Sequence, residues 1–388
     1  MLIASEAQLE AVKEAFEDNF TQRRELGASL SIWKQGREVL SLHQGWCERE
    51  QERPWTEETL AVVWSSTKGP ASACVLRALD ESGGGLETPV GEVWPALRTG
   101  RLTMGQLLSH QGGLAVLDEA ASVFDYPAVV RALEGQAPHW QPPRHGYHPR
   151  TFGFLLDEVV RRLAGGESLA SYWQRNFAAP LRLDFWIGLP EAEEPRVARL
   201  YPGRMPGRAE ETALYTEFIQ AHGDPASLTA RAFASPRGLG GVQEMNQPRV
   251  WRAEFPGFGG IGSARSLGKF YAMMAQGGFW QGQRYLSEKV LRWMRTALTN
   301  GPDEVLKLPA SFTAGLMKDP LGRDGRKSRL TFGPSTSAFG HPGAGGSLGF
   351  ADPENGLAYA YVMNQMEFGI LPGQKSNAMV RALYGLAG

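Results

Sequence analysis

The chain has 388 residues, and its 40 Lys and Arg against 41 Asp and Glu leave a formal net charge of −1. With 42% hydrophobic residues it can bury a large core, which excludes a mostly disordered chain, and it lacks the basic surplus of an electrostatic nucleic-acid binder. Its two cysteines, Cys47 and Cys74, exclude a disulfide-stapled scaffold. A single disulfide between them remains an alternative, and two buried free thiols are the simpler interpretation.

No segment approaches the roughly 18 consecutive apolar residues of a membrane-spanning helix, so we expect no membrane partner. The N-terminal residues lack a basic region followed by a long apolar stretch, and acidic residues follow at Glu6 and Glu10. This start does not have the pattern of an export signal. We therefore expect a soluble, cytoplasmic protein.

The first predicted element is an amphipathic helix. Ser5 and Gln8 form a capping-box pattern, and apolar residues then recur on one helical face: Leu9, Val12, Phe16 and Phe20. Two short β-type runs follow, at residues 28–33 and 39–43, around a polar turn. They predict a hairpin.

The middle of the chain has helical patterns. Residues 68–79 are rich in Ala and Leu and are followed by three glycines at 83–85, a helix-ending signal. Residues 152–163 carry Leu and Val at helical spacing. The segment 191–256 is polar and punctuated by Pro and Gly, so the sequence assigns no element there.

Strand patterns return near the C-terminus, at residues 312–317, 347–350 and 357–363, the last two around a turn at 352–356. A final helix is predicted over about residues 374–386. Strands at both ends with helices between them predict an α+β fold, in which an antiparallel sheet split in sequence is flanked by helices and interrupted by a mainly helical insertion.

The strongest candidate motif is Ser65-Ser66-Thr67-Lys68 at the start of a helical pattern. Positions i and i+3 share a helix face, so the amine of Lys68 can reach the hydroxyl of Ser65. A serine hydroxyl is a weak nucleophile, and a lysine held neutral by burial could activate it. The alternative is a serine N-cap followed by a surface lysine.

Further blocks follow in a characteristic order: Leu-Leu-Ser-His-Gln-Gly-Gly-Leu at 107–114, Gly-Tyr-His at 146–148, a glycine-rich run at 257–264 and His-Pro-Gly-Ala-Gly-Gly at 341–346. With Ser65 and Lys68, this order resembles the class C β-lactamase-like serine hydrolases. That superfamily includes family VIII carboxylesterases, D-amino-acid peptidases, acyltransferases and penicillin-binding proteins.

The resemblance runs from about Gly27 to the C-terminus. It implies one β-lactamase-like catalytic unit over residues 1–388. Within this unit, about 1–60 and 300–388 would form an α/β sheet subdomain, and about 61–299 a mainly helical insertion.

The resemblance also implies site residues. Ser65 would be the nucleophile, Lys68 its partner, and Tyr147 the tyrosine of the family's Tyr-x-Asn motif, which relays protons. A cationic Lys68 would favour an ionised Tyr147. The motif's third position is Pro149 instead of Asn. The missing side-chain amide argues against β-lactam and peptide turnover.

His341-Pro342-Gly343 aligns with the family's Lys-Thr-Gly strand. A neutral imidazole at His341 is a weaker anion anchor than an ammonium, so the substrate need not carry the carboxylate of a β-lactam. Gly343 would let the substrate approach the backbone. The N–H groups of Ser65 and Ala344 would form the oxyanion hole.

Two other motifs are interpreted as decoys. Ser347 lies in a Gly-x-Ser-x-Gly pattern, but a nucleophile elbow needs a helix after the serine, and a strand pattern follows here. The run 257–262 reads Gly-x-Gly-x-x-Gly, but Pro256 precedes it and no acidic residue stands at the required spacing. Dinucleotide binding is therefore not expected, and the run would border the site.

Three histidines cluster near Tyr147, but they have no acidic or cysteine partner at ligand spacing, so we expect no metal and no cofactor. His110 is expected to brace a helix. Aromatic residues near the motifs could line an acyl pocket or pack in the core: Trp64, Trp140, Phe152 and Phe258, of which Trp64 and Phe258 are our candidates for substrate binding.

The sequence therefore predicts a serine hydrolase that cleaves small-molecule carboxylic esters through an acyl-enzyme. A β-lactamase or D-aminopeptidase, an acyltransferase, and an inactive ligand-binding homologue stay open as alternatives. The sequence does not decide whether the protein is a homo-oligomer.

Overall fold

The computed structural model describes residues 3–98, 101–204 and 215–386. Its main feature is an eight-stranded antiparallel sheet in the order β2-β1-β13-β12-β11-β10-β9-β8. The strands are β1 Gly27–Lys34, β2 Arg37–Gly45, β8 Gly301–Pro302, β9 Pro309–Phe312, β10 Met317–Lys318, β11 Phe339–Pro342, β12 Leu348–Asp352 and β13 Leu357–Met363. The two ends of the chain therefore meet in one sheet, as predicted for the α+β fold.

The central strand β13 shows how the sequence sets the two faces of the sheet. Its residues Leu357, Tyr359, Tyr361 and Met363 face one apolar core, whereas Ala358, Ala360 and Val362 face the other. Because neighbouring strand residues point to opposite faces, this alternation places large side chains on one side and small ones on the other. The small side leaves room for a helix to approach closely.

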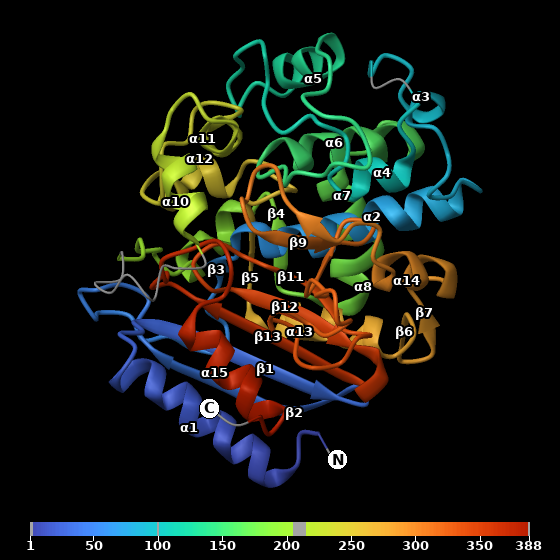
Figure 1. The fold of residues 1–388 in the computed structure, drawn as a ribbon. Helices are drawn as coiled ribbons and strands as arrows, with labels where there is room; N and C mark the ends of the chain where they lie inside the picture. The colour runs from blue at the N-terminus through green and yellow to red at the C-terminus, as the bar shows by residue number, and fades with distance from the viewer. Residues whose placement is uncertain (1–2, 99–100, 205–214, 387–388) are drawn as a thin grey trace.

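Helices cover both faces (Figure 1). The helix α13 Ala264–Ala275 packs on the small-residue face, against β1, β12 and β13. On the opposite face lie α1 Glu6–Thr21 and α15 Gln374–Leu383, which contact each other. The predicted capping box is confirmed, because Ser5 Oγ accepts from the Gln8 N–H and Gln8 Oε1 accepts from the Ser5 N–H.

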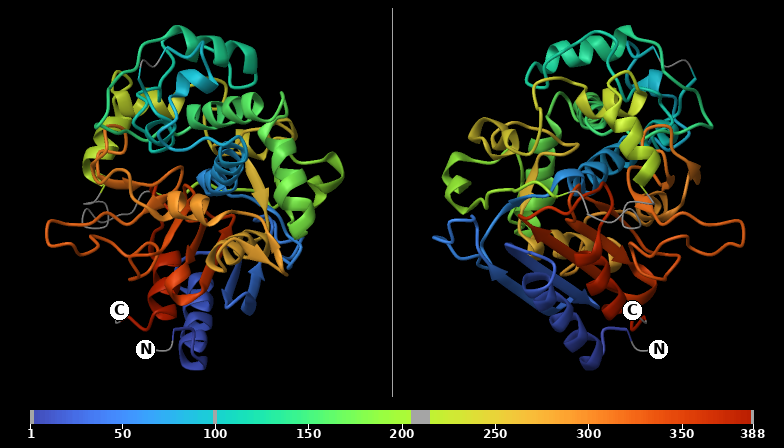
Figure 2. Two further views of the ribbon diagram at one scale, coloured as in Figure 1. Left: turned by 90° about the vertical axis from the view of Figure 1, so that its right-hand side faces the viewer. Right: turned by 60° about the vertical axis from the view of Figure 1, so that its left-hand side comes forward.

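The remaining helices form the other half of the molecule, away from α1 and α15 (Figure 2). They are α2 Lys68–Glu81, α3 Val90–Val93, α4 Met104–Leu108, α5 Tyr126–Gly135, α6 Thr151–Leu163, α7 Leu169–Trp173, α8 Ala179–Leu181, α10 Thr216–Gly223, α11 Leu228–Ala234, α12 Pro248–Trp251 and α14 Glu288–Arg295. Two smaller sheets join them: β3 Ala61–Val62 with β5 Gly260–Gly262 and β4 Phe185–Ile187, and the pair β6 Phe279–Trp280 and β7 Gln283–Arg284. Among the described helices, none has the length and apolarity needed to cross a lipid bilayer.

Two predictions about the elements need correction or completion. The predicted strand 312–317 is wrong, because the chain turns between β9 and β10 at Gly315, whose φ is +87°. This turn packs on α2, where Ser72 Oγ donates to the Gly315 carbonyl at 2.9 Å. The unassigned segment 191–256 contains α10, α11 and α12, and its residues 205–214 lie outside the described part of the chain.

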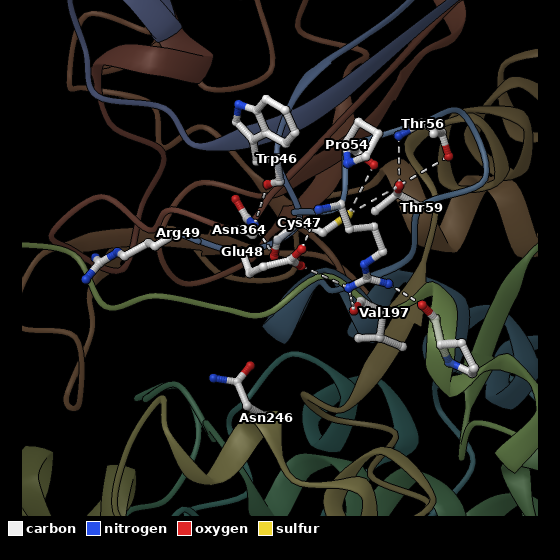
Figure 3. Close-up of polar contacts among 12 residues, drawn as sticks. Trp46, Cys47, Glu48, Arg49, Pro54, Thr56, Thr59, Val197, Asn246 and Asn364 are labelled. Atoms are coloured by element: carbon white, nitrogen blue, oxygen red, sulfur yellow. Dashed lines mark hydrogen bonds and ion pairs between the residues drawn. The ribbon is translucent and has the colours of Figure 1, made fainter. Parts of the chain in front are cut away.

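The loop between β2 and β3 is fastened to the end of β13 (Figure 3). Asn364 Nδ2 donates to the carbonyl oxygens of Trp46 at 3.0 Å and Cys47 at 2.9 Å. From the other side, Arg53 donates to the Val197 carbonyl at 2.8 Å. Cys47 and Cys74 are both buried free thiols, as the sequence suggested. The loop therefore enters β3, the strand before Ser65, from a fixed position.

Candidate active site

Ser65 lies on a short 3₁₀ turn, Trp64–Thr67, that connects β3 to α2. Trp64 has a φ of +49°, a left-handed conformation that is strained for a bulky residue. The turn is held by Thr67 Oγ1, which accepts from the Gly260 N–H at 2.8 Å. Ser65 is partly exposed, whereas the next three residues are buried.

Lys68 is the first residue of α2, and it is fully buried. Its Nζ lies 3.1 Å from Ser65 Oγ, 3.0 Å from the Pro149 carbonyl oxygen and 2.6 Å from the Gly257 carbonyl oxygen. Burial lowers the pKa of the Lys68 amine well below its usual value, because desolvation disfavours the ammonium. A neutral amine can donate its two N–H groups to the carbonyls and turn its lone pair toward the Ser65 hydroxyl.

Tyr147 completes this group from a loop before α6. Its hydroxyl donates to Ser65 Oγ at 2.7 Å, and Lys68 Nζ lies 4.8 Å from the centre of its ring. Burial raises the pKa of the Tyr147 phenol above its usual value. The phenol is therefore neutral and a hydrogen-bond donor, in contrast to the ionised tyrosine expected from the sequence.

The loop that carries Tyr147 is fixed by buried neighbours. Gly146 N–H donates to the His110 carbonyl at 3.1 Å, and His148 N–H donates to His110 Nδ1 at 3.2 Å. The His110 ring packs 5.1 Å from the Tyr147 ring and 4.2 Å from the Phe152 ring. His110, which lies just after α4, thus braces the loop that carries Tyr147.

His341, on β11, faces the same site. Its Nδ1 lies 2.7 Å from the Pro342 carbonyl oxygen, so the proton of the neutral ring belongs on Nδ1, and its buried Nε2 has no partner among the described residues. Burial lowers the pKa of His341 to about 3, because desolvation disfavours the charged imidazolium. The ring is therefore neutral and offers an acceptor instead of a cation.

Two backbone donors also reach the site. Neither the Ser65 N–H nor the Ala344 N–H makes a hydrogen bond within the described residues, and both residues line one cavity. Gly343, next to Ala344, does not line it. A Cβ on Gly343 would lie 2.1 Å from the Val63 carbonyl oxygen. The glycine thus allows the end of β11 to approach the segment before Ser65 closely, and its role toward substrate stays a prediction.

The cavity beside Ser65 has a volume of about 30 Å³. Its walls are mostly apolar and come from distant segments: Ser65, Tyr147, Phe233, Leu306, Met317, His341, Pro342, Ala344, Ile370 and Leu371. Trp64 and Phe258, expected to bind substrate, are not among them. Trp64 packs against the core of the helical half, and Phe258 stacks on Phe255 with ring centres 5.0 Å apart.

Several of these lining residues carried no signal in the sequence. Phe233 belongs to α11, in the segment that the sequence left unassigned, and Ile370 and Leu371 follow the last strand in a loop. Leu306 lies in the turn that starts at Asp303. Only its Pro302-Asp303-Glu304 turn composition could have drawn attention to that segment.

The two motifs interpreted as decoys have other contexts. Ser347 is followed directly by the strand β12, not by a helix, and its buried Oγ has no partner among the described residues. The glycine run borders the site, because the Gly257 carbonyl accepts from Lys68. The three histidines near Tyr147 make separate contacts: His148 with His110, His145 with Phe312, and His139 with Asp118.

The chain is similar to known proteins over nearly its whole length. Residues 12–375 match the family model described as Beta-lactamase. The chain is 30% identical over 375 residues to Esterase/beta-lactamase LipL of Mycobacterium tuberculosis. The aligned region covers 94% of this chain and 82% of LipL. A penicillin-binding protein homologue from Caulobacter crescentus is 30% identical, with a TM-score of 0.84 over 99% of this chain and 98% of that one. A family VIII carboxylesterase structure is 31% identical, with a TM-score of 0.84 over 99% of this chain and 98% of its own.

Proposed function

From the premise that the chain belongs to the beta-lactamase family of hydrolases and has that family's α+β fold, we propose that it cleaves carboxylic esters through an acyl-enzyme on Ser65. One observation carries this proposal. Ser65 Oγ lies within hydrogen-bond distance of both the buried Lys68 amine, whose pKa is lowered by burial, and the Tyr147 phenol, whose pKa is raised by burial. A base and an acid on one hydroxyl are what acyl transfer to serine requires.

In the acylation step, Lys68 Nζ takes the Ser65 proton while Ser65 Oγ attacks the ester carbonyl carbon. The negative charge on the carbonyl oxygen is met by the N–H groups of Ser65 and Ala344, which are free to donate. When the ester C–O bond breaks, Tyr147 gives its proton to the leaving alkoxide. The acyl-enzyme then holds a Lys68 ammonium beside a Tyr147 phenolate, and the cation stabilises the anion.

In the deacylation step, the Tyr147 phenolate takes a proton from water, and the resulting hydroxide attacks the acyl carbon. Ser65 Oγ leaves and recovers its proton from the Lys68 ammonium. All three side chains return to their starting protonation states, and the products are an alcohol and a carboxylic acid. No further donor or acceptor is needed.

The walls of the cavity support an ester with an apolar acyl group. Phe233, Leu306, Met317, Ile370 and Leu371 are apolar, and the described lining contains no Lys or Arg. His341 is neutral, so it offers no cation to a substrate carboxylate. Pro149 supplies only a carbonyl, which Lys68 occupies. These features favour a neutral ester over an anionic amide.

Hydrolysis of short-chain p-nitrophenyl esters and labelling by a fluorophosphonate test the proposal. Ser65→Ala is expected to abolish both, and Ser347→Ala is expected to retain both, because Ser347 lies outside the cavity. Mass spectrometry of the labelled peptide identifies the nucleophile. An adduct on Ser347, or ester hydrolysis by Ser65→Ala, would overturn the assignment. An unmodified protein that is neither labelled nor active would indicate an inactive, ligand-binding homologue.

β-Lactam hydrolysis is the second candidate, because the relative LipL is named both an esterase and a β-lactamase. A nitrocefin assay beside the ester assay separates the two. We expect kcat/KM for the ester to exceed that for nitrocefin, since the cavity offers no cation for the lactam carboxylate. The reverse order would make β-lactam hydrolysis the main activity.

A further inference from the structure

A buried carboxylate lies directly behind the Tyr147 loop. Asp303 is 3% exposed, and its two oxygens accept the Tyr147 N–H at 3.1 and 2.9 Å. Asp303 Oδ1, the oxygen at 3.1 Å, also accepts the N–H groups of Val305 at 2.8 Å and Leu306 at 2.7 Å. Three backbone donors from two segments thus converge on one side chain.

This carboxylate and His110 together hold the Tyr147 loop. The N–H groups of Gly146 and His148 bond to His110, and the N–H between them bonds to Asp303. Three successive N–H groups, those of Gly146, Tyr147 and His148, are therefore hydrogen-bonded, to His110, Asp303 and His110 in turn. A second link between the two segments joins the Glu304 N–H to the His145 carbonyl at 3.0 Å.

The turn that Asp303 closes also forms a wall of the cavity. Leu306 lines the cavity, and the Val305 carbonyl accepts from Thr229 Oγ1 of α11 at 2.8 Å. The helix α11 carries Phe233, another lining residue. One carboxylate thus connects the Tyr147 loop to the apolar wall.

We propose that Asp303 is a positioning residue that fixes the backbone of Tyr147, so that its phenol lies against Ser65, and sets the wall residue Leu306 at the same time. This inference rests on the proposed function, in which Tyr147 is the acid and base. Asp303 does not touch the reacting atoms and acts only through Tyr147 and the wall.

The chemistry of the contacts requires a carboxylate. An ionised Asp presents acceptors in all directions, whereas an Asn at this place would turn an N–H₂ group toward a backbone N–H. Asp303→Asn therefore removes at least one of the converging hydrogen bonds and releases the Tyr147 loop on one side. A catalytic group misplaced by about 1 Å costs roughly 10²-fold in rate.

A double-mutant cycle tests the proposal, with kcat/KM for a p-nitrophenyl ester and the rate of fluorophosphonate labelling as readouts. Asp303→Asn is expected to lower kcat/KM by about 10- to 100-fold in the unmodified protein, and to lower labelling less, because labelling uses Lys68 as the base and expels no alkoxide. In the Tyr147→Phe background, where no phenol remains to be positioned, the same substitution is expected to lower them by less than about threefold. If Asp303→Asn does not fold, the cycle uses Asp303→Glu, which keeps the charge but displaces the oxygens by one methylene.

Asp319→Asn is the matched control. Asp319 is also buried and accepts two backbone N–H groups, from Thr331 at 3.0 Å and Phe332 at 3.1 Å, but it does not contact the Tyr147 loop. It should lose stability without losing kcat. Equal losses from Asp303→Asn in both Tyr147 backgrounds, or activity equal to that of Asp319→Asn, would overturn the positioning role. Absence of hydrolysis and labelling in the unmodified protein would overturn the proposed function, and this inference with it.

Discussion

Lys68 Nζ lies 3.1 Å from Ser65 Oγ, and burial alone lowers the pKa of the Lys68 amine, without help from a charged neighbour. The amine is therefore available as a base without a second basic residue. Its two carbonyl partners, from Pro149 and Gly257, orient it by accepting its N–H groups.

Replacement of Lys68 removes the base. Lys68→Met is expected to lower kcat/KM for ester hydrolysis by about 10²- to 10⁴-fold, the usual contribution of general acid–base catalysis. Lys68→Arg should be as inactive, because a guanidinium stays protonated. Steady-state kinetics and fluorophosphonate labelling measure this. An active Lys68→Arg variant would show that deprotonation at position 68 is not required.

The depressed pKa of Lys68 also makes a prediction about stability. The folded pKa lies below the unfolded value, so the unfolded chain binds more protons between the two pKa values, and the free energy of unfolding rises with pH across that window. Lys68→Met lacks this dependence. The stability advantage of Lys68→Met over the unmodified protein should therefore shrink as the pH rises toward about 10. Urea unfolding over this pH range measures the difference, and a difference that stays constant contradicts the shift.

A substitution at Gly343 tests whether the close approach of β11 to the turn that carries Ser65 positions an oxyanion donor. Gly343→Ala places a Cβ 2.1 Å from the Val63 carbonyl oxygen and pushes the Ala344 N–H away from Ser65. Loss of one oxyanion donor costs about 10²- to 10³-fold in kcat. Gly91→Ala, in α3, is the control, because nothing lies within 4 Å of its Cβ, and it should leave kcat unchanged. Unchanged kcat in Gly343→Ala would remove Ala344 from the oxyanion hole.

Phe233 belongs to the apolar wall of the cavity beside Ser65, so we expect its side chain to limit the length of the acyl group. Phe233→Ala should shift the preference toward longer p-nitrophenyl esters. Each additional buried methylene contributes about 0.8 kcal/mol, or roughly fourfold in kcat/KM. Phe124→Ala, at an exposed phenylalanine, should leave the chain-length profile unchanged. A profile that is the same in both variants would place the acyl group elsewhere.

The sequence predicted the parts of the site that local spacing determines. The approach of Lys68 to Ser65 follows from the i, i+3 relation on a helix, and the structure brings Tyr147 and His341 to the same place. The split antiparallel sheet also followed from strand patterns at both ends. By contrast, the strand predicted at 312–317 was wrong. The strand-forming residues on both sides of Gly315 gave a stronger pattern than the turn signal of a single glycine.

The apolar wall and Asp303 could not be predicted in the same way. Asp303 binds backbone N–H groups, which every residue but proline possesses, so nothing in the sequence names Tyr147 as its partner. Phe233 lines the cavity from α11, and Thr229 of the same helix donates to the Val305 carbonyl. Such contacts depend on tertiary packing and have no local pattern.

The pairing of β1 with β13 has a consequence for synthesis. Residues 28–34 pair with residues 357–363, so the edge of β1 has no partner until almost the whole chain has been made. At about 5–20 residues per second, this edge stays open for tens of seconds, and an unpaired strand edge can pair with another chain. Pairings so distant in sequence also form slowly. Yield should therefore depend on temperature and chaperones more than the stability of the finished protein would suggest.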